Sequence, residues 1–158
     1  MSHFVRLSAL LLLCVFAQTS CFVPLAAGEN ETPLPIIFDT DIDTDCDDAG
    51  ALAMLHFLAD EGEVEILATL CSSHYAWSVP CIEAINTHFG RPDLPIGAPK
   101  LPGASDRRGS PYAKAIAERF PGKYRTNADA PDAVRIYRQI LANAQDDSVV
   151  IVSVGYLT

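Results

Sequence analysis

The strongest constraint on this chain is the ten-residue run Asp39–Asp48, which contains six aspartates. An apolar run, Pro35–Phe38, precedes it, and Asp48–Leu58 follows with the three-to-four spacing of a buried helix face. Two carboxylates about 4 Å apart repel by about 1 kcal/mol in water and about 4 kcal/mol near a protein surface. The sequence therefore predicts a bound cation, because uncompensated repulsion of this size would oppose folding.

The cation that this loop favours is a hard one that prefers oxygen ligands. A helix N-terminus stabilises a nearby carboxylate by about 0.3–1 kcal/mol, which helps Asp47 and Asp48 but not the whole set. No cluster of His and Cys ligands accompanies the carboxylates, so Ca²⁺ is favoured over Zn²⁺. A solvated acidic turn is the alternative, but such a turn seldom joins a buried strand to a buried helix.

Two other acidic motifs fit this loop less well. An EF-hand loop is excluded, because counting from Asp39 or from Asp41 gives neither Gly at the sixth position nor Glu at the twelfth. A phosphatase-like strand followed by DxD, with an aspartate nucleophile, is closer. It departs at Asp43, where a hydroxyl or a small residue is expected.

The chain after this loop alternates strand-like and helical runs. We expect strands at Pro35–Phe38, Val64–Leu70, Leu94–Gly97 and Val149–Val154, and helices at Asp48–Leu58, Ser78–Phe89, Ala113–Phe120 and Asp132–Ala144. Apolar strands that alternate with helices predict an α/β fold with an open, mainly parallel sheet and helices on both faces. Such sheets bind ligands at the carboxyl ends of their strands, so the loops after Phe38 and Val154 are the expected site.

Residues 1–28 are predicted to be a signal peptide and leader. Arg6 precedes the apolar run Leu7–Phe16, and small residues that suit cleavage follow at Ala17–Ser20 and Ala26–Gly28. The run is short for a permanent membrane span. We therefore expect a secreted or periplasmic protein without stable membrane insertion, whose domain occupies residues 33–158.

Charge and cysteines limit the partners and the redox chemistry. The chain has 11 Lys and Arg against 20 Asp and Glu, a net charge of −9, without a basic stripe, so nucleic acid is not an expected partner. A homo-oligomer is left open. In an oxidising compartment Cys71 and Cys81 either pair or stay as buried thiols, and the sequence leaves both alternatives open.

The acidic loop and its flanks resemble a known metal motif. The run Ile36-Ile37-Phe38-Asp39-Thr40-Asp41, followed by Asp45 and by Asp47-Asp48-Ala49-x-Ala51-Leu52, closely resembles the DTDxGxDxDDAxAL form of the motif of inosine-uridine-preferring nucleoside hydrolases. Three further segments are similar to later strands of that family: Ile66–Ser73, Pro95–Gly97 and Val149–Thr158. The resemblance thus identifies residues 33–158 as the N-terminal part of a nucleoside hydrolase-like domain.

This resemblance implies one Ca²⁺ at the bottom of a pocket and hydrolysis of the N-glycosidic bond of ribonucleosides to ribose and free base. By motif position, Asp41 is the catalytic base and a metal ligand, and Asp48 binds the metal through both oxygens. Asp47 contacts the metal and a ribose hydroxyl, and the carbonyl of Val154 is a backbone ligand. His74 falls near the ribose and the leaving group, with an ordinary surface-loop histidine as the alternative.

Two departures from the family pattern bear on these assignments. Asp43 stands where the family has Gly, and a second register with Asp43 as the base is possible, although Asp39-Thr40-Asp41 at the strand end favours Asp41. The chain also corresponds to about half of the family's fold. The absent half would carry the last metal-binding Asp and the His that protonates the base, so we expect no nucleoside hydrolysis by these residues alone. A non-catalytic remnant that binds Ca²⁺ and ribose is the rival interpretation.

Overall fold

The computed structural model describes residues 32–43, 45–103 and 111–157. The predicted signal peptide and leader, residues 1–28, lie outside the described residues, so export stays a prediction. Thr44, Thr158 and the middle of the loop Ala98–Pro111 also lie outside them.

Strands and helices alternate along the described chain. The strands are β1 (Leu34–Thr40), β2 (Val64–Cys71), β3 (Ile96–Gly97) and β4 (Val150–Ser153). The helices are α1 (Asp47–Asp60), α2 (Ser78–His88), α3 (Pro111–Arg119) and α4 (Ala133–Asn143), with the short 3₁₀ helix η1 (Asn127–Asp129) before α4. The predicted order of these elements is confirmed, and their ends differ from the expected ones by no more than two residues.

The four strands form one parallel sheet in the order β3-β2-β1-β4. The chain runs outward from β1 through β2 to β3 and then returns to the other side of β1 as β4. The strand order therefore reverses at β1, and such sheets bind ligands at the carboxyl ends of the strands beside this reversal, here β1 and β4. The predicted α/β fold with an open parallel sheet is confirmed.

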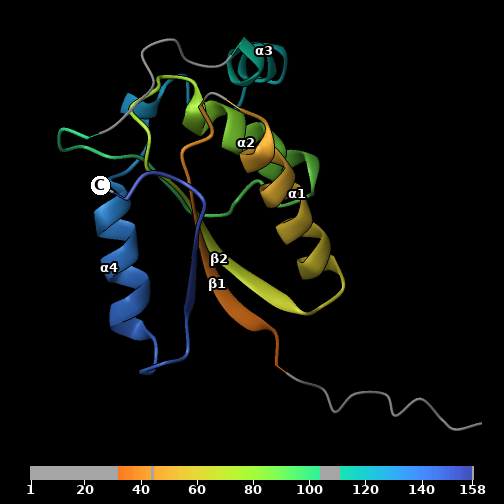
Figure 1. Ribbon diagram of the computed structural model, residues 1–158, viewed down its shortest axis with the longest axis vertical. Helices are drawn as coiled ribbons and strands as arrows, with labels where there is room; N and C mark the ends of the chain where they lie inside the picture. Colours follow the sequence, from red (N-terminus) through yellow and green to blue (C-terminus); the bar gives the residue numbers. More distant parts are fainter. Residues whose placement is uncertain (1–31, 44, 104–110, 158) are drawn as a thin grey trace, which may run out of the picture. The chain divides into compact units, whose positions relative to one another are not determined.

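Helices cover both faces of this sheet, with α1 and α2 on one side and α4 on the other (Figure 1). Alternate residues of β1 serve the two layers, because successive side chains of a strand point to opposite faces. Ile36 and Phe38 belong to the core beneath α1 and α2, whereas Ile37 packs with Ala133 and Ile136 of α4. The same alternation sends the last two side chains of β1 to opposite faces of the sheet.

A bulge in β2 resets this alternation in the neighbouring strand. Ile36 pairs with Ile66 but Ile37 pairs with Ala68, so Leu67 is an extra residue in β2. Leu67 and Ala68 both contribute to the α4 layer. After the bulge, each residue of β2 faces the same side of the sheet as its partner in β1.

The described helices are short. The longest, α1, has 14 residues, and none of the helices in the described ranges combines the length and the apolar character that crossing a bilayer requires.

The cysteines Cys71 and Cys81 are buried and free, so the buried-thiol alternative is confirmed. Burial raises the pKa of both thiols to about 12, which keeps them protonated and unreactive.

A buried polar chain connects α1, α2 and β2. His56 is fully buried, with Nε2 2.9 Å from Oδ1 of Asn86, and Nδ2 of Asn86 donates to Oγ1 of Thr69 at 2.8 Å. Nη1 of Arg91 lies 3.4 Å from Nδ1 of His56, and Arg91 also pairs with Asp60 at 2.6 Å. Since Asn86 and Arg91 offer an acceptor and a donor, His56 is held neutral with its proton on Nε2. Burial lowers the pKa of His56.

The neutral state of His56 predicts a loss of stability in acid. Because the folded pKa lies below the usual 6.5, the unfolded chain binds the extra proton more readily, and stability falls as the pH decreases below 6.5. His56→Gln stays neutral and retains an amide beside Asn86. We expect this variant to be less stable than wild type at about pH 7.5, with a smaller loss on acidification to about pH 5.5. Thermal unfolding at both values measures this, with His88→Gln on the exposed side of α2 as the control. Equal losses in wild type and His56→Gln would contradict the account.

Candidate metal centre

The end of β1 and the start of α1 are joined by a side-chain hydrogen bond. Thr40 is fully buried, and its Oγ1 donates to Oδ1 of Asp48 at 2.5 Å. The same Oγ1 accepts from the backbone N–H of Ile42 at 3.2 Å. Thr40 therefore fixes the first turn of the acidic loop and holds the carboxylate of Asp48 toward the end of the sheet.

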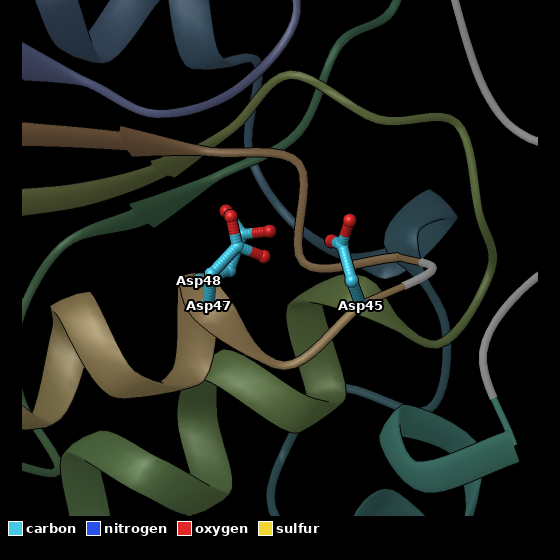
Figure 2. Close-up of side chains that lie close together, drawn as sticks. All are labelled: Asp45, Asp47 and Asp48. Carbon is cyan, nitrogen blue, oxygen red and sulfur yellow. The ribbon is translucent and has the colours of Figure 1, made fainter.

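Three carboxylates gather at the N-terminus of α1. Asp45, Asp47 and Asp48 each offer an oxygen, and these oxygens all lie within 4.8 Å of one another. Figure 2 shows Asp47 and Asp48 on the first turn of α1 and Asp45 on the preceding loop, with the carboxylates pointing to the same side. Asp48 is buried, whereas Asp45 and Asp47 are exposed. The three are close enough to bind one metal ion together.

Asp41 lies beside this cluster, as its electrostatics show. Burial is the main cause that raises the pKa of Asp41 to about 6, and the nearby carboxylates of Asp48 and Asp43 add to it. Burial also raises the pKa of Asp48, against the hydrogen bond from Thr40. A hydrogen bond between Asp45 and Asp47 raises the pKa of Asp45. These carboxylates thus bind protons more readily than isolated ones, and a bound cation would compete with those protons.

Asp43 takes a structural position in the loop. It is fully buried, and Oγ of Ser73 donates to its Oδ2 at 2.7 Å. Among the described residues other than glycine, a positive φ is found at Asp147 and not at Asp43, so the loop turns here without the left-handed backbone that favours Gly. Because Asp41 is half-buried and Asp43 is enclosed, the geometry favours Asp41 as the carboxylate that a substrate can reach.

The end of β4 lies against the same loop. The backbone N–H of Val154 donates to the carbonyl of Asp39 at 2.9 Å. At Gly155, an added Cβ would lie 2.7 Å from the backbone nitrogen of Asp41 and 2.3 Å from Oγ of Ser72. Only a residue without a side chain allows this approach, so the structure brings the segment that contains Val154 next to Asp41.

His74 lies beside the loop without joining the cluster in the described contacts. It follows Ser72 and Ser73, which contact β4 and the acidic loop, but its own Nε2 is 2.7 Å from the carbonyl oxygen of Leu101. The ring is exposed. The structure therefore places His74 near the centre while engaging its ring with the start of the loop Ala98–Pro111.

Sequence reasoning missed several residues that support the centre. Asp45 was not among the expected ligands, although it belongs to the three-carboxylate cluster. Asn127 is buried, donates to the carbonyl of Ser73 at 2.9 Å and accepts from the N–H of Val79 at 2.8 Å. Asn127 thereby fixes the loop that carries Ser73. Its sequence neighbourhood gives no signal of this role, because its partners lie 48 and 54 residues away.

Comparison of the chain with models of known protein families and with curated proteins finds no match. The resemblance to nucleoside hydrolases therefore depends on the motif residues themselves.

The raised pKa of Asp41 predicts the stability of the metal-free protein. The folded state prefers the protonated carboxyl, so this contribution is present below pH 3.8 and is lost as the pH rises through about 6. Asp41→Asn removes the charge. We expect it to raise the melting temperature of the metal-free protein at about pH 7.5 and to change it little at about pH 4.

The control for this comparison is Asp60→Asn, which removes a carboxylate from the exposed ion pair with Arg91 at the other end of α1. It is expected not to raise the melting temperature at either pH. Thermal unfolding in the presence of a chelator measures both variants. If Asp41→Asn shifts the melting temperature equally at the two pH values, burial and the neighbouring carboxylates do not raise the pKa of Asp41.

Proposed function

We propose that this protein is a Ca²⁺-dependent hydrolase of the N-glycosidic bond of ribonucleosides, with the acidic loop as its metal-binding site. The proposal depends on one observation, the gathering of Asp45, Asp47 and Asp48 beside Asp41 at the carboxyl end of β1. The motif resemblance supports the choice of Ca²⁺ and of a ribosyl substrate.

The donor set suits a hard cation. Carboxylate oxygens are the ligands that Ca²⁺ prefers, and 6–8 oxygens complete its coordination. Asp45, Asp47 and Asp48 would hold the ion, with Asp41 and the backbone carbonyl of Val154 next to them. When bound, Ca²⁺ supplies a Lewis acid that holds ribose hydroxyls and lowers the pKa of a water.

The remaining chemistry belongs to the residues of the chain. Asp41 would accept a proton from the attacking water, since it is half-buried and next to Asp48. Asp47 is exposed on the first turn of α1 and would accept a hydrogen bond from a ribose hydroxyl. Thr40 and Ser73 would keep Asp48 and Asp43 in place while the substrate binds.

A phosphatase-like reaction is disfavoured by the direction of Asp39. In the DxD interpretation Asp39 is the nucleophile, but its Oδ2 accepts from the Tyr137 hydroxyl at 3.0 Å on the α4 side of the sheet. The carboxylate of Asp48 is bonded to Thr40, on the α1 side. A nucleophile and a metal ligand on opposite faces would not act on one phosphoryl group. The rival that remains is a non-catalytic protein that binds Ca²⁺ and ribose.

The metal assignment predicts that Asp48→Ala weakens Ca²⁺ binding at least about 10-fold, because a buried ligand is lost together with its support from Thr40. Asp60→Ala, at the far end of the same helix, is expected to bind as wild type does. Calorimetric titration of the metal-free proteins measures both. Equal affinity in wild type and in Asp48→Ala would refute the metal site.

Catalysis is tested with a substrate whose leaving group needs no proton. Hydrolysis of inosine or uridine also requires protonation of the leaving base, which is worth about 10²–10⁴-fold, so these substrates do not isolate the role of Asp41. p-Nitrophenyl riboside releases a stable anion, so Ca²⁺ and Asp41 suffice. We expect slow release of nitrophenol that requires Ca²⁺ and is lost in Asp41→Ala. Binding of Ca²⁺ without any such release would favour the non-catalytic rival.

A further inference from the structure

Asp39, the first aspartate of the loop, stands apart from the metal cluster. The pleat of β1 turns its side chain toward α4, whereas that of Thr40 points toward α1. Oδ2 of Asp39 accepts from the Tyr137 hydroxyl at 3.0 Å, and its Oδ1 lies 3.5 Å from Oγ of Ser153. Its carboxylate is therefore used within the protein, between α4 and β4.

The backbone of Asp39 also holds β4. Asp39 pairs with Ser153 in the sheet, and its carbonyl accepts the N–H of Val154 at 2.9 Å. Side chain and main chain of this one residue thus fix the carboxyl end of β4, the last element before the loop segment Val154–Tyr156. Tyr137 of α4 secures the arrangement from the other layer.

The segment fixed in this way lies against Asp41. The space for a Cβ at Gly155 is taken by the backbone of Thr40 and Asp41 and by Oγ of Ser72. Oγ of Ser72 also accepts from the N–H of Tyr156 at 3.1 Å. The backbone of Gly155 packs directly against the backbone of Thr40 and Asp41. A displacement of β4 would therefore shift Asp41.

We propose that Asp39 and Tyr137 are positioning residues, which fix the segment Val154–Tyr156 against Asp41 and so set the affinity of the acidic loop for a divalent cation without contacting it. This inference rests on the metal site of the proposed function. It predicts an effect that crosses the sheet, from a hydroxyl on α4 to an ion bound at the start of α1.

The test uses Ca²⁺ and its luminescent substitute Tb³⁺. Tyr137→Phe removes the hydroxyl and keeps the ring, and we expect it to weaken binding of both ions about 10-fold, as for other residues that orient metal ligands. The matched control is Tyr124→Phe, at a buried tyrosine beside Lys123 in the loop after α3. It loses a hydroxyl from the fold, and we expect wild-type affinity.

A second readout separates positioning from a general loss of stability. Luminescence lifetimes of bound Tb³⁺ in H₂O and in D₂O count the waters on the ion. In Tyr137→Phe and in Asp39→Ala we expect about one additional water on the ion. This water would replace the backbone carbonyl oxygen of Val154, which moves away with its segment. Asp39→Asn retains an acceptor for the Tyr137 hydroxyl, so its affinity and water count are expected to lie closer to those of wild type.

The outcomes distinguish this inference from the proposed function. If wild type binds Ca²⁺ and Tb³⁺ and Asp48→Ala does not, the metal site stands. If Tyr137→Phe and Asp39→Ala then match Tyr124→Phe in affinity and water count, the positioning role is wrong. If wild type binds neither ion, the metal site and the positioning role are both refuted, whatever the result with p-nitrophenyl riboside.

Discussion

Mutual repulsion among the six aspartates of Asp39–Asp48 is the constraint on which the arrangement of this domain depends. The fold separates them by direction and gives three of them a hydroxyl donor, each from a different part of the chain. The pairs are Tyr137 with Asp39, Ser73 with Asp43 and Thr40 with Asp48. A neutral donor stabilises a carboxylate but leaves its charge in place. Asp45, Asp47 and Asp48 therefore lie together at the start of α1 as a negatively charged group, with Asp41 beside them.

The sheet topology explains why these donors come from distant segments. The strand order reverses at β1, so this strand has β2 on one side and β4 on the other, and its carboxyl end meets the loops that follow both. Ser73 belongs to the loop after β2, and Tyr137 to the helix that leads to β4. The pleat of β1 then assigns Asp39 to one layer and Thr40 to the other. A single strand end thereby connects both helical layers to one site.

The fold and the position of the carboxylate cluster could be predicted from the sequence, because both depend on strong local patterns. The alternation of apolar strands with helices predicted the parallel sheet, and the acidic loop predicted a group of carboxylates that could hold a metal ion. The short helix η1 was missed. It is formed by a capping box between Thr126 and Asp129 and by the buried amide of Asn127, none of which produces hydrophobic periodicity.

The contacts that organise the loop were beyond sequence reasoning for a related reason. Ser73 and Asp43 are 30 residues apart, and Tyr137 and Asp39 are 98 apart, so only the packed sheet brings them together. Asp43 illustrates the limit. Its departure from the family pattern was evident, but that its carboxylate turns inward to Ser73 depends on the loop after β2. Which carboxylate stays open to solvent is decided by tertiary contacts.

The bulge at Leu67 ties the length of β2 to the chemistry at its end. Beyond it Thr69 faces α2, Leu70 faces α4, and Ser72 and Ser73 reach β4 and the acidic loop respectively. If β2 kept all its residues but ran as a regular strand without the bulge, each of these directions would be reversed. Ser73 would then face away from Asp43, and Thr69 would leave Asn86. The bulge, which sets the face of the sheet that each later residue of β2 points to, is therefore as much a requirement of this site as the identity of its aspartates.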